Sequence, residues 1–152
     1  MKLKNVSLSD RQLRLRVPAD WAESQEADGG VAFYDPKQDH GTLRVKVMTF
    51  TTGDDLSGHS ALEELRAIEP EPDQTLEGLP NGNALRFHQE SMDAGGGDTF
   101  IHVWLLASID PPHRMRLAVF SFTARAPVEG AVVKELDAEI RQAAFAHQSR
   151  DS

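Results

Sequence analysis

The chain contains no cysteine, and this absence excludes a whole group of functions. Without thiols it has no disulfide, no thiolate metal site and no cysteine nucleophile. A cysteine-free chain also suits a reducing compartment, and we therefore expect a cytoplasmic protein.

Long hydrophobic runs are missing as well. No window approaches the roughly 18 apolar residues of a membrane-spanning helix, so we expect no insertion into a membrane. The opening sequence, MKLKNVSLSDRQLRLRV, has lysines but no apolar run behind them, which is unlike a secretory signal peptide.

Basic charge is in deficit. The formal net charge is −8 at pH 7, whereas nucleic-acid binders usually carry a basic excess, so we expect no nucleic-acid partner. The acidic residues concentrate in segments 54–73 and 129–139, which read as helices, and many of the basic residues lie in strand-like segments.

Catalytic and phosphate-binding motifs are absent too. The sequence has no G-x-S-x-G, no G-x-x-x-x-G-K and no G-x-G-x-x-G. The run Gly95–Gly97 lacks a following lysine and helix, and we interpret it as a hairpin loop. We therefore expect no enzymatic activity and no cofactor.

What remains is an ordinary globular composition. The chain has 152 residues, of which 39% are hydrophobic, enough for one domain with a sizeable core. We assign residues 1–147 to a single domain and residues 148–152 to a polar C-terminal tail.

Period-two alternation and turn residues predict the elements. We expect strands at 12–17, 31–34, 42–51, 84–90, 99–109 and 115–124, with a further short strand at 75–77. One helix is expected at 60–68, where Ser60 and Glu63 fit a capping box, and another from Pro127 onward. The short loops imply hairpins. The strands at 99–109 and 115–124 are apolar on both faces, so we expect them to be central in the sheet and covered on each side. The predicted fold is α+β: a single-domain α/β sandwich with a mostly antiparallel sheet of about six strands covered by two helices.

The most unusual pattern is a row of cations on strands. Arg14 and Arg16 alternate with leucines, and the 42–51 strand has Arg44 and Lys46 on one face, followed by Met48 and Phe50. We group these residues as one mixed face. The row has three explanations: pairing with acids of the helices or neighbouring strands, protection of exposed strands against aggregation, or binding of an acidic or amphipathic partner.

Histidines supply a competing hypothesis. A regular hairpin closed at Gly95 pairs His88 with His102 and Arg86 with Trp104, and brings Glu90 near the histidines. Imidazole and carboxylate groups suit zinc, so His88, His102 and Glu90 form an alternative metal or small-ligand site on the central hairpin. A slip of one residue in the register removes the pair.

The layout resembles the PsbP/Mog-like fold, in particular its bacterial members, the type VI effector-chaperone-like and DcrB-like proteins. The resemblance rests on these segments: Val17-Pro18-Ala19-Asp20-Trp21, the short strand with Phe33, the Leu43 strand leading into a helix, the Leu76-Glu77-Gly78-Leu79-Pro80 turn, and the C-terminal helix after Phe122. Members of this group are mostly not enzymes, and some look like chaperones that cradle an apolar effector segment on an open sheet face.

The resemblance therefore implies a non-catalytic protein-binding module. We expect a chaperone or adaptor that engages a partner protein, for instance a secreted effector, through Arg14, Arg16, Arg44, Lys46, Met48 and Phe50. In this chain, cations interrupt the face that corresponds to the apolar face of those chaperones. This difference is consistent with a different client protein. An exposed sheet edge also permits a homodimer.

Overall fold

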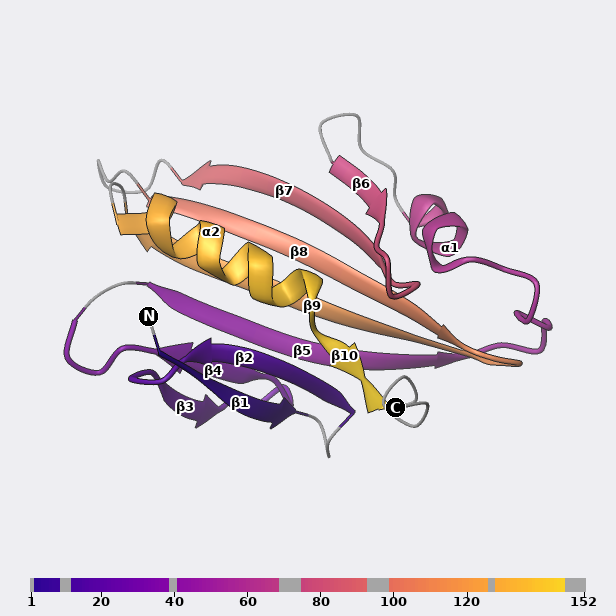
Figure 1. Cartoon of the computed structure of the whole chain (residues 1–152), viewed down its shortest axis with the longest axis horizontal. Helices are drawn as coiled ribbons and strands as arrows, with labels where there is room; N and C mark the ends of the chain where they lie inside the picture. Colours follow the sequence, from indigo (N-terminus) through magenta and orange to yellow (C-terminus); the bar gives the residue numbers. More distant parts are fainter. Residues whose placement is uncertain are drawn as a thin grey trace.

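The computed structural model describes residues 2–8, 12–38, 41–68, 75–92, 99–125 and 128–146. Within these ranges the chain forms ten strands and two helices, and every strand pairing there is antiparallel. The predicted tail at 148–152 and the loop at Gly95–Gly97 lie outside the described residues. The predicted α+β class is confirmed, but the strands form two sheets and not one (Figure 1).

A seven-stranded sheet forms the middle of the molecule, in the order β3-β4-β5-β9-β8-β7-β6. Its strands are β3 (Ala22–Gln25), β4 (Val31–Tyr34), β5 (Thr42–Thr51), β6 (Thr75–Gly78), β7 (Ala84–Met92), β8 (Thr99–Asp110) and β9 (Arg114–Arg125). The two strands that are apolar on both faces, β8 and β9, take inner positions, as the sequence predicted.

A three-stranded sheet lies beside it, in the order β1-β2-β10. Its strands are β1 (Leu3–Leu8), β2 (Leu13–Pro18) and the two-residue β10 (Ala144–Phe145). We did not predict β1, β3 or β10. The segment LKNVSL mixes polar and apolar residues, and its pairing with β2 is what makes it a strand.

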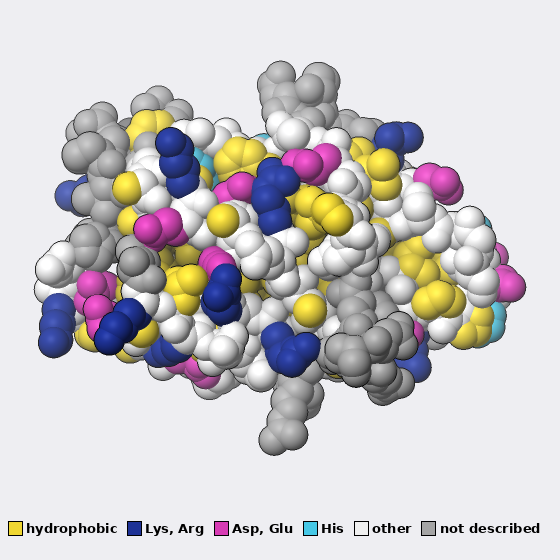
Figure 2. Space-filling view, viewed as in Figure 1, with side chains coloured by type: hydrophobic (Ala, Val, Ile, Leu, Met, Phe, Trp, Pro, Cys, Tyr) yellow, Lys and Arg dark blue, Asp and Glu magenta, His cyan; other side chains and the backbone are white. Residues whose placement is uncertain are grey.

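The main core lies between one face of the large sheet and a second layer made of the small sheet and helix α2 (Val128–Arg141). In Figure 1 both α2 and the β1–β2 pair lie over the large sheet on the viewer's side. Leu13, Leu15 and Val17 of β2 are buried against this core. Figure 2, from the same side, shows Lys and Arg side chains scattered among acidic and hydrophobic ones.

A smaller core lies on the opposite face of the large sheet, which we call the outer sheet face. There helix α1 (Ala61–Ala67) packs Ala61 and Leu65 onto Ala84, Ala107 and Leu117. Ser60 caps α1 by accepting a hydrogen bond from the backbone N–H of Glu63 at 3.1 Å, so the predicted helix start is confirmed. The chain thus has three layers, but α1 contacts only β6, β7 and β8 substantially.

Candidate functional site

The six residues predicted as one face lie on two sides of the molecule. Arg14 and Arg16 belong to the small sheet and point away from the core that buries Leu13 and Leu15. Arg44 and Lys46 alternate with the buried Leu43 and Val45 on β5 and so lie on the outer sheet face. Met48 and Phe50 share that outer face because they follow at the same period. The prediction of a single mixed face was wrong, since it assumed that β2 and β5 belong to one sheet.

The outer sheet face carries a row of half-buried apolar side chains next to Arg44 and Lys46. Lys46 pairs with Val119 on β9, and Val119 pairs with Leu105 on β8. Period two then places Ile101 and Val103 on the same face as Leu105. We call these four residues the outer strip: Ile101, Val103, Leu105 and Val119.

Among the described residues, the only helix packed on this face is α1. It sits at the end marked by Ala84, Ala107 and Leu117, where Met48, Leu105 and Ile109 also contact its core. A seven-residue helix is about 10 Å long, whereas a 12-residue strand such as β8 extends about 40 Å. Much of the outer sheet face therefore lies beyond the reach of α1.

Two acidic residues of the β3–β4 connection lie next to the cations. Arg44 Nε is 3.3 Å from Glu26 Oε1, and Lys46 Nζ is 3.9 Å from Asp28 Oδ2. Both cationic side chains are about half exposed, at 51% and 45%. Exposed pairs of this kind contribute only about 0–1 kcal/mol to stability. They orient the two cationic side chains but leave them able to bind another carboxylate.

Phe50 is the last of the β5 side chains on the outer sheet face that were predicted to bind a partner. It is 46% exposed, an unusual position for a phenylalanine, and Met48 beside it is half-buried. The outer sheet face thus combines an apolar strip, two cations and an exposed aromatic ring. Arginine and aromatic residues are enriched in protein interfaces, whereas lysine is depleted.

The histidine prediction was wrong in register by one residue. His88 pairs with Val103, and His102 pairs with Gln89. The two histidines therefore lie on opposite faces of the sheet, with His102 buried and stacked on Phe87. Only Glu90 stays beside His88, 3.3 Å from its Nε2. Nowhere in the described ranges do three or more His, Asp or Glu side chains come together to hold a metal ion.

The same slip separates Arg86 from Trp104. Trp104 lies in the main core, and its indole Nε1 donates a hydrogen bond to Asp137 of α2 at 3.0 Å. Arg86 is buried on the outer sheet face, where its Nη2 donates to the backbone carbonyls of Leu65 and Ile68 at the end of α1. Arg86 therefore anchors α1, and it lies opposite Leu105 and not opposite Trp104 as predicted.

The sequence did contain a signal for the outer strip, but we misinterpreted it. Because β8 and β9 are apolar on both faces, we expected both faces to be covered. One face is covered by α2, as predicted, whereas Val103 and Val119 on the other are only half-buried. A strand that is apolar on both faces fits either a covered sheet or a sheet face that a partner covers.

Comparison with known proteins adds evidence on the fold. No protein-family model matches the chain, and no curated protein has a matching sequence. A crystal structure from Bacteroides thetaiotaomicron VPI-5482 matches 95% of this chain and 49% of its own, with a TM-score of 0.64 and 17% identity. A point mutant of the protein Mog1 matches 95% of this chain and 96% of its own, with a TM-score of 0.52 and 13% identity.

LpqN, a protein "involved in cell envelope biogenesis of Mycobacterium tuberculosis", matches 95% of this chain and 90% of its own, with a TM-score of 0.55 and 14% identity. The chain has the PsbP/Mog-like fold. It spans about half the length of the Bacteroides protein. At these identities the likeness concerns the fold. Within the described part of the chain, no helix is long and apolar enough to cross a membrane.

Proposed function

We propose that this chain is a non-catalytic protein-binding domain, a chaperone or adaptor that holds an amphipathic, acidic helix of a partner protein on the outer sheet face. The observation that carries the proposal is the outer strip, in which Leu105 contacts the core under α1 but Ile101, Val103 and Val119 have no described helix packed on them. The resemblance to effector chaperones adds a secreted effector as one class of partner.

The choice of a helix as occupant follows from the layers. On the inner face of the large sheet, the 14-residue α2 is about 21 Å long and supplies a full helical layer beside the small sheet. On the outer sheet face α1 supplies only about half that length. A partner helix lying beyond α1 would complete the third layer by burying the outer strip.

The acidic character of the partner helix follows from the positive charges beside the outer strip. Arg44 and Lys46 flank the outer strip along β5, half exposed and held only by surface ion pairs. A partner carboxylate can displace Glu26 or Asp28 at little cost, because exposed pairs of this kind contribute only about 0–1 kcal/mol. We therefore expect acidic residues along one side of the partner helix.

Two synthetic amphipathic peptides test the proposal. They carry leucine at the same i, i+3, i+4, i+7 positions and differ only in having glutamate or lysine at the polar positions. Fluorescence anisotropy should show tighter binding of the glutamate peptide. The net charge of −8 favours the lysine peptide through long-range attraction, so the predicted order requires the local cations.

Variants locate the binding. Val103→Glu, which puts a charge into the outer strip, and Arg44→Gln with Lys46→Gln should each weaken binding of the glutamate peptide about tenfold. The matched control is Lys2→Gln with Lys134→Gln. These two exposed lysines, before β1 and on α2, lie on the other side of the molecule, so removing the same charge there should leave binding unchanged. Equal effects of both charge pairs, or tighter binding of the lysine peptide, would reject the proposal.

A further inference from the structure

A groove on the opposite side of the molecule contains the two arginines that do not belong to the outer sheet face. It has a volume of about 440 Å³ and lies between the outer surface of β1–β2 and the C-terminal end of α2 with β10. We call it the β2–α2 groove. Its lining comes from three chain segments: Asn5 to Ser7, Arg14 to Arg16, and Glu139 with Gln142 to Ala144.

The strand register places four polar side chains on the floor of the groove. Asn5 pairs with Arg16, and Ser7 pairs with Arg14, so all four share the outward face of the β1–β2 pair. Side chains directly opposite on antiparallel strands have Cβ atoms about 5 Å apart. The polar groups at this site therefore share one face as a consequence of strand pairing and not of a loop conformation.

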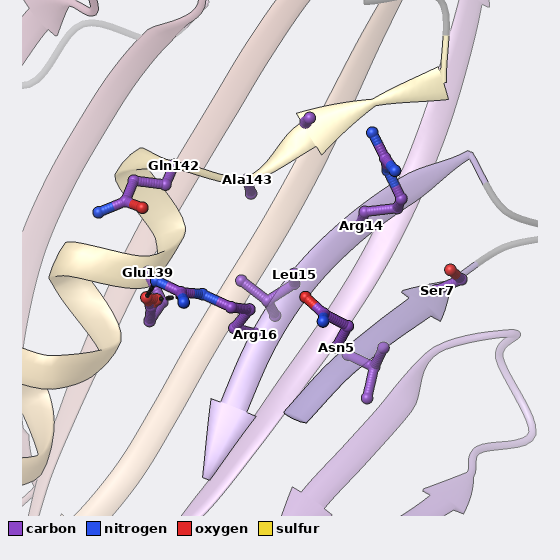
Figure 3. A pocket seen from close by; sticks show the side chains of 10 residues that line it. Asn5, Ser7, Arg14, Leu15, Arg16, Glu139, Gln142 and Ala143 are labelled. Carbon is purple, nitrogen blue, oxygen red and sulfur yellow. Dashed lines mark hydrogen bonds and ion pairs between the residues drawn. The ribbon is translucent and has the colours of Figure 1, made fainter. Parts of the chain in front are cut away.

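Arg16 and Glu139 form one wall. Arg16 donates from Nε to Glu139 Oε2 at 3.2 Å and from Nη2 to Oε1 at 2.5 Å, and the Glu139 side chain is only 8% exposed. Figure 3 shows Arg16 reaching across to α2, whereas Arg14 extends away from it on the side of β10. The guanidinium of Arg16 is thus already neutralised, and that of Arg14 is the available cation.

Arg14 has no carboxylate within 4.0 Å among the described residues. Of the ionisable residues that line the groove, two are cations and one is a carboxylate, a net charge of +1 in a chain of net charge −8. The remaining polar lining is Asn5, Ser7 and Gln142, all of which can donate hydrogen bonds. Ala144 pairs with Arg14 and supplies apolar lining on the same face, together with the aliphatic stems of the two arginines.

We infer that the β2–α2 groove binds a carboxylate with an apolar body, through the guanidinium of Arg14. The planar fork of arginine matches the two oxygens of a carboxylate, and Ser7 and Asn5 lie on the same face to donate to it. The apolar body lies along Ala144, which pairs with Arg14, and along the aliphatic stem of Arg14. The groove volume is within the range of small-molecule pockets, about 300–1,000 Å³. This site is separate from the outer sheet face and does not depend on the proposed function.

The test uses hexanoate and its neutral isostere hexanamide, titrated into the ¹⁵N-labelled full chain. Hexanoate should shift amide signals of residues 5–7, 14–16 and 142–144, and hexanamide should leave them in place. Arg14→Gln should weaken hexanoate binding about tenfold, whereas Arg44→Gln, on the other side, should not change it. An unchanged melting temperature of Arg14→Gln confirms that the variant is folded.

Equal shifts with both compounds, no localised shifts, or full hexanoate binding by Arg14→Gln would overturn the inference. A leucine-ended tetrapeptide with a free or an amidated C-terminus then distinguishes the source of the carboxylate. Tighter binding of the free-carboxylate peptide than of hexanoate assigns the groove to a peptide C-terminus. Tighter binding of hexanoate assigns it to a small organic acid.

Discussion

Arg16 of β2 and Glu139 of α2 form a two-point ion pair between elements that are 123 residues apart in sequence. The pair connects the small sheet to the helix that covers the large sheet. For Arg16, the pair supports the first of the three explanations for the cationic row, which is pairing with an acid of a helix. Arg16 pairs with an acid of a helix, while Arg14, two residues earlier on the same face, is left for other uses.

The first prediction compares these two arginines. Arg16→Met leaves the nearly buried Glu139 carboxylate without its partner and should lower the free energy of unfolding by about 1–3 kcal/mol. Arg14→Met, on the same strand and face, should cost less than about 0.5 kcal/mol. Urea denaturation of the two variants measures the difference. Equal costs would contradict the structural role assigned to Arg16.

The second prediction concerns the anchor of α1. Arg86→Met removes the donor to the carbonyls of Leu65 and Ile68 and should cost about 1–3 kcal/mol. The backbone amides of α1 should exchange hydrogen faster relative to those of β8, because α1 loses its attachment to the sheet. The control, Arg66→Met on the exposed side of α1, should stay within about 0.5 kcal/mol of the wild type. Unchanged exchange in α1 would show that Arg86 does not hold the helix.

The third prediction is a pH effect at the start of α1. His59 Nδ1 lies 2.6 Å from Glu64 Oε1, and this hydrogen bond raises the pKa of His59 above its usual 6.5. The stabilisation that this contact gives is therefore fully present below pH 6.5 and is lost as the pH rises through the raised pKa of His59. Glu64→Gln should bring the pKa of His59, measured by NMR titration, back toward 6.5. Glu63→Gln should lower it less, and the reverse order would contradict the assignment.

Local patterns in the sequence predicted the elements well because their causes are local. Ser60 caps α1 as expected, since the capping bond spans only three residues. The hairpin register failed because it depends on the number of residues in the connecting loop, and a shift of one residue sends His88 and His102 to opposite faces. The Arg86 contact with α1 had no local signal, because its acceptors are backbone carbonyls of another element.

The candidate site was only half predictable, for a topological reason. Arg44, Lys46, Met48 and Phe50 share a face because they alternate on one strand, and period two requires it. Whether Arg14 joins them depends on which strand β2 pairs with, and β2 pairs with β1 and β10 in a separate sheet. That choice is made by long-range contacts between apolar side chains, which single-strand patterns do not encode.

Site-specific photo-crosslinking tests the central claim most directly. A photoreactive phenylalanine analogue replaces Val103 in the outer strip or, as the control, the exposed Ala138 on α2, in cells that make the protein naturally. Mass spectrometry then identifies the crosslinked segment. We predict an adduct from position 103 to an amphipathic, acidic segment of another protein, and no such adduct from position 138. Adducts from position 138 alone, or from position 103 only to a second copy of this chain, would contradict the account.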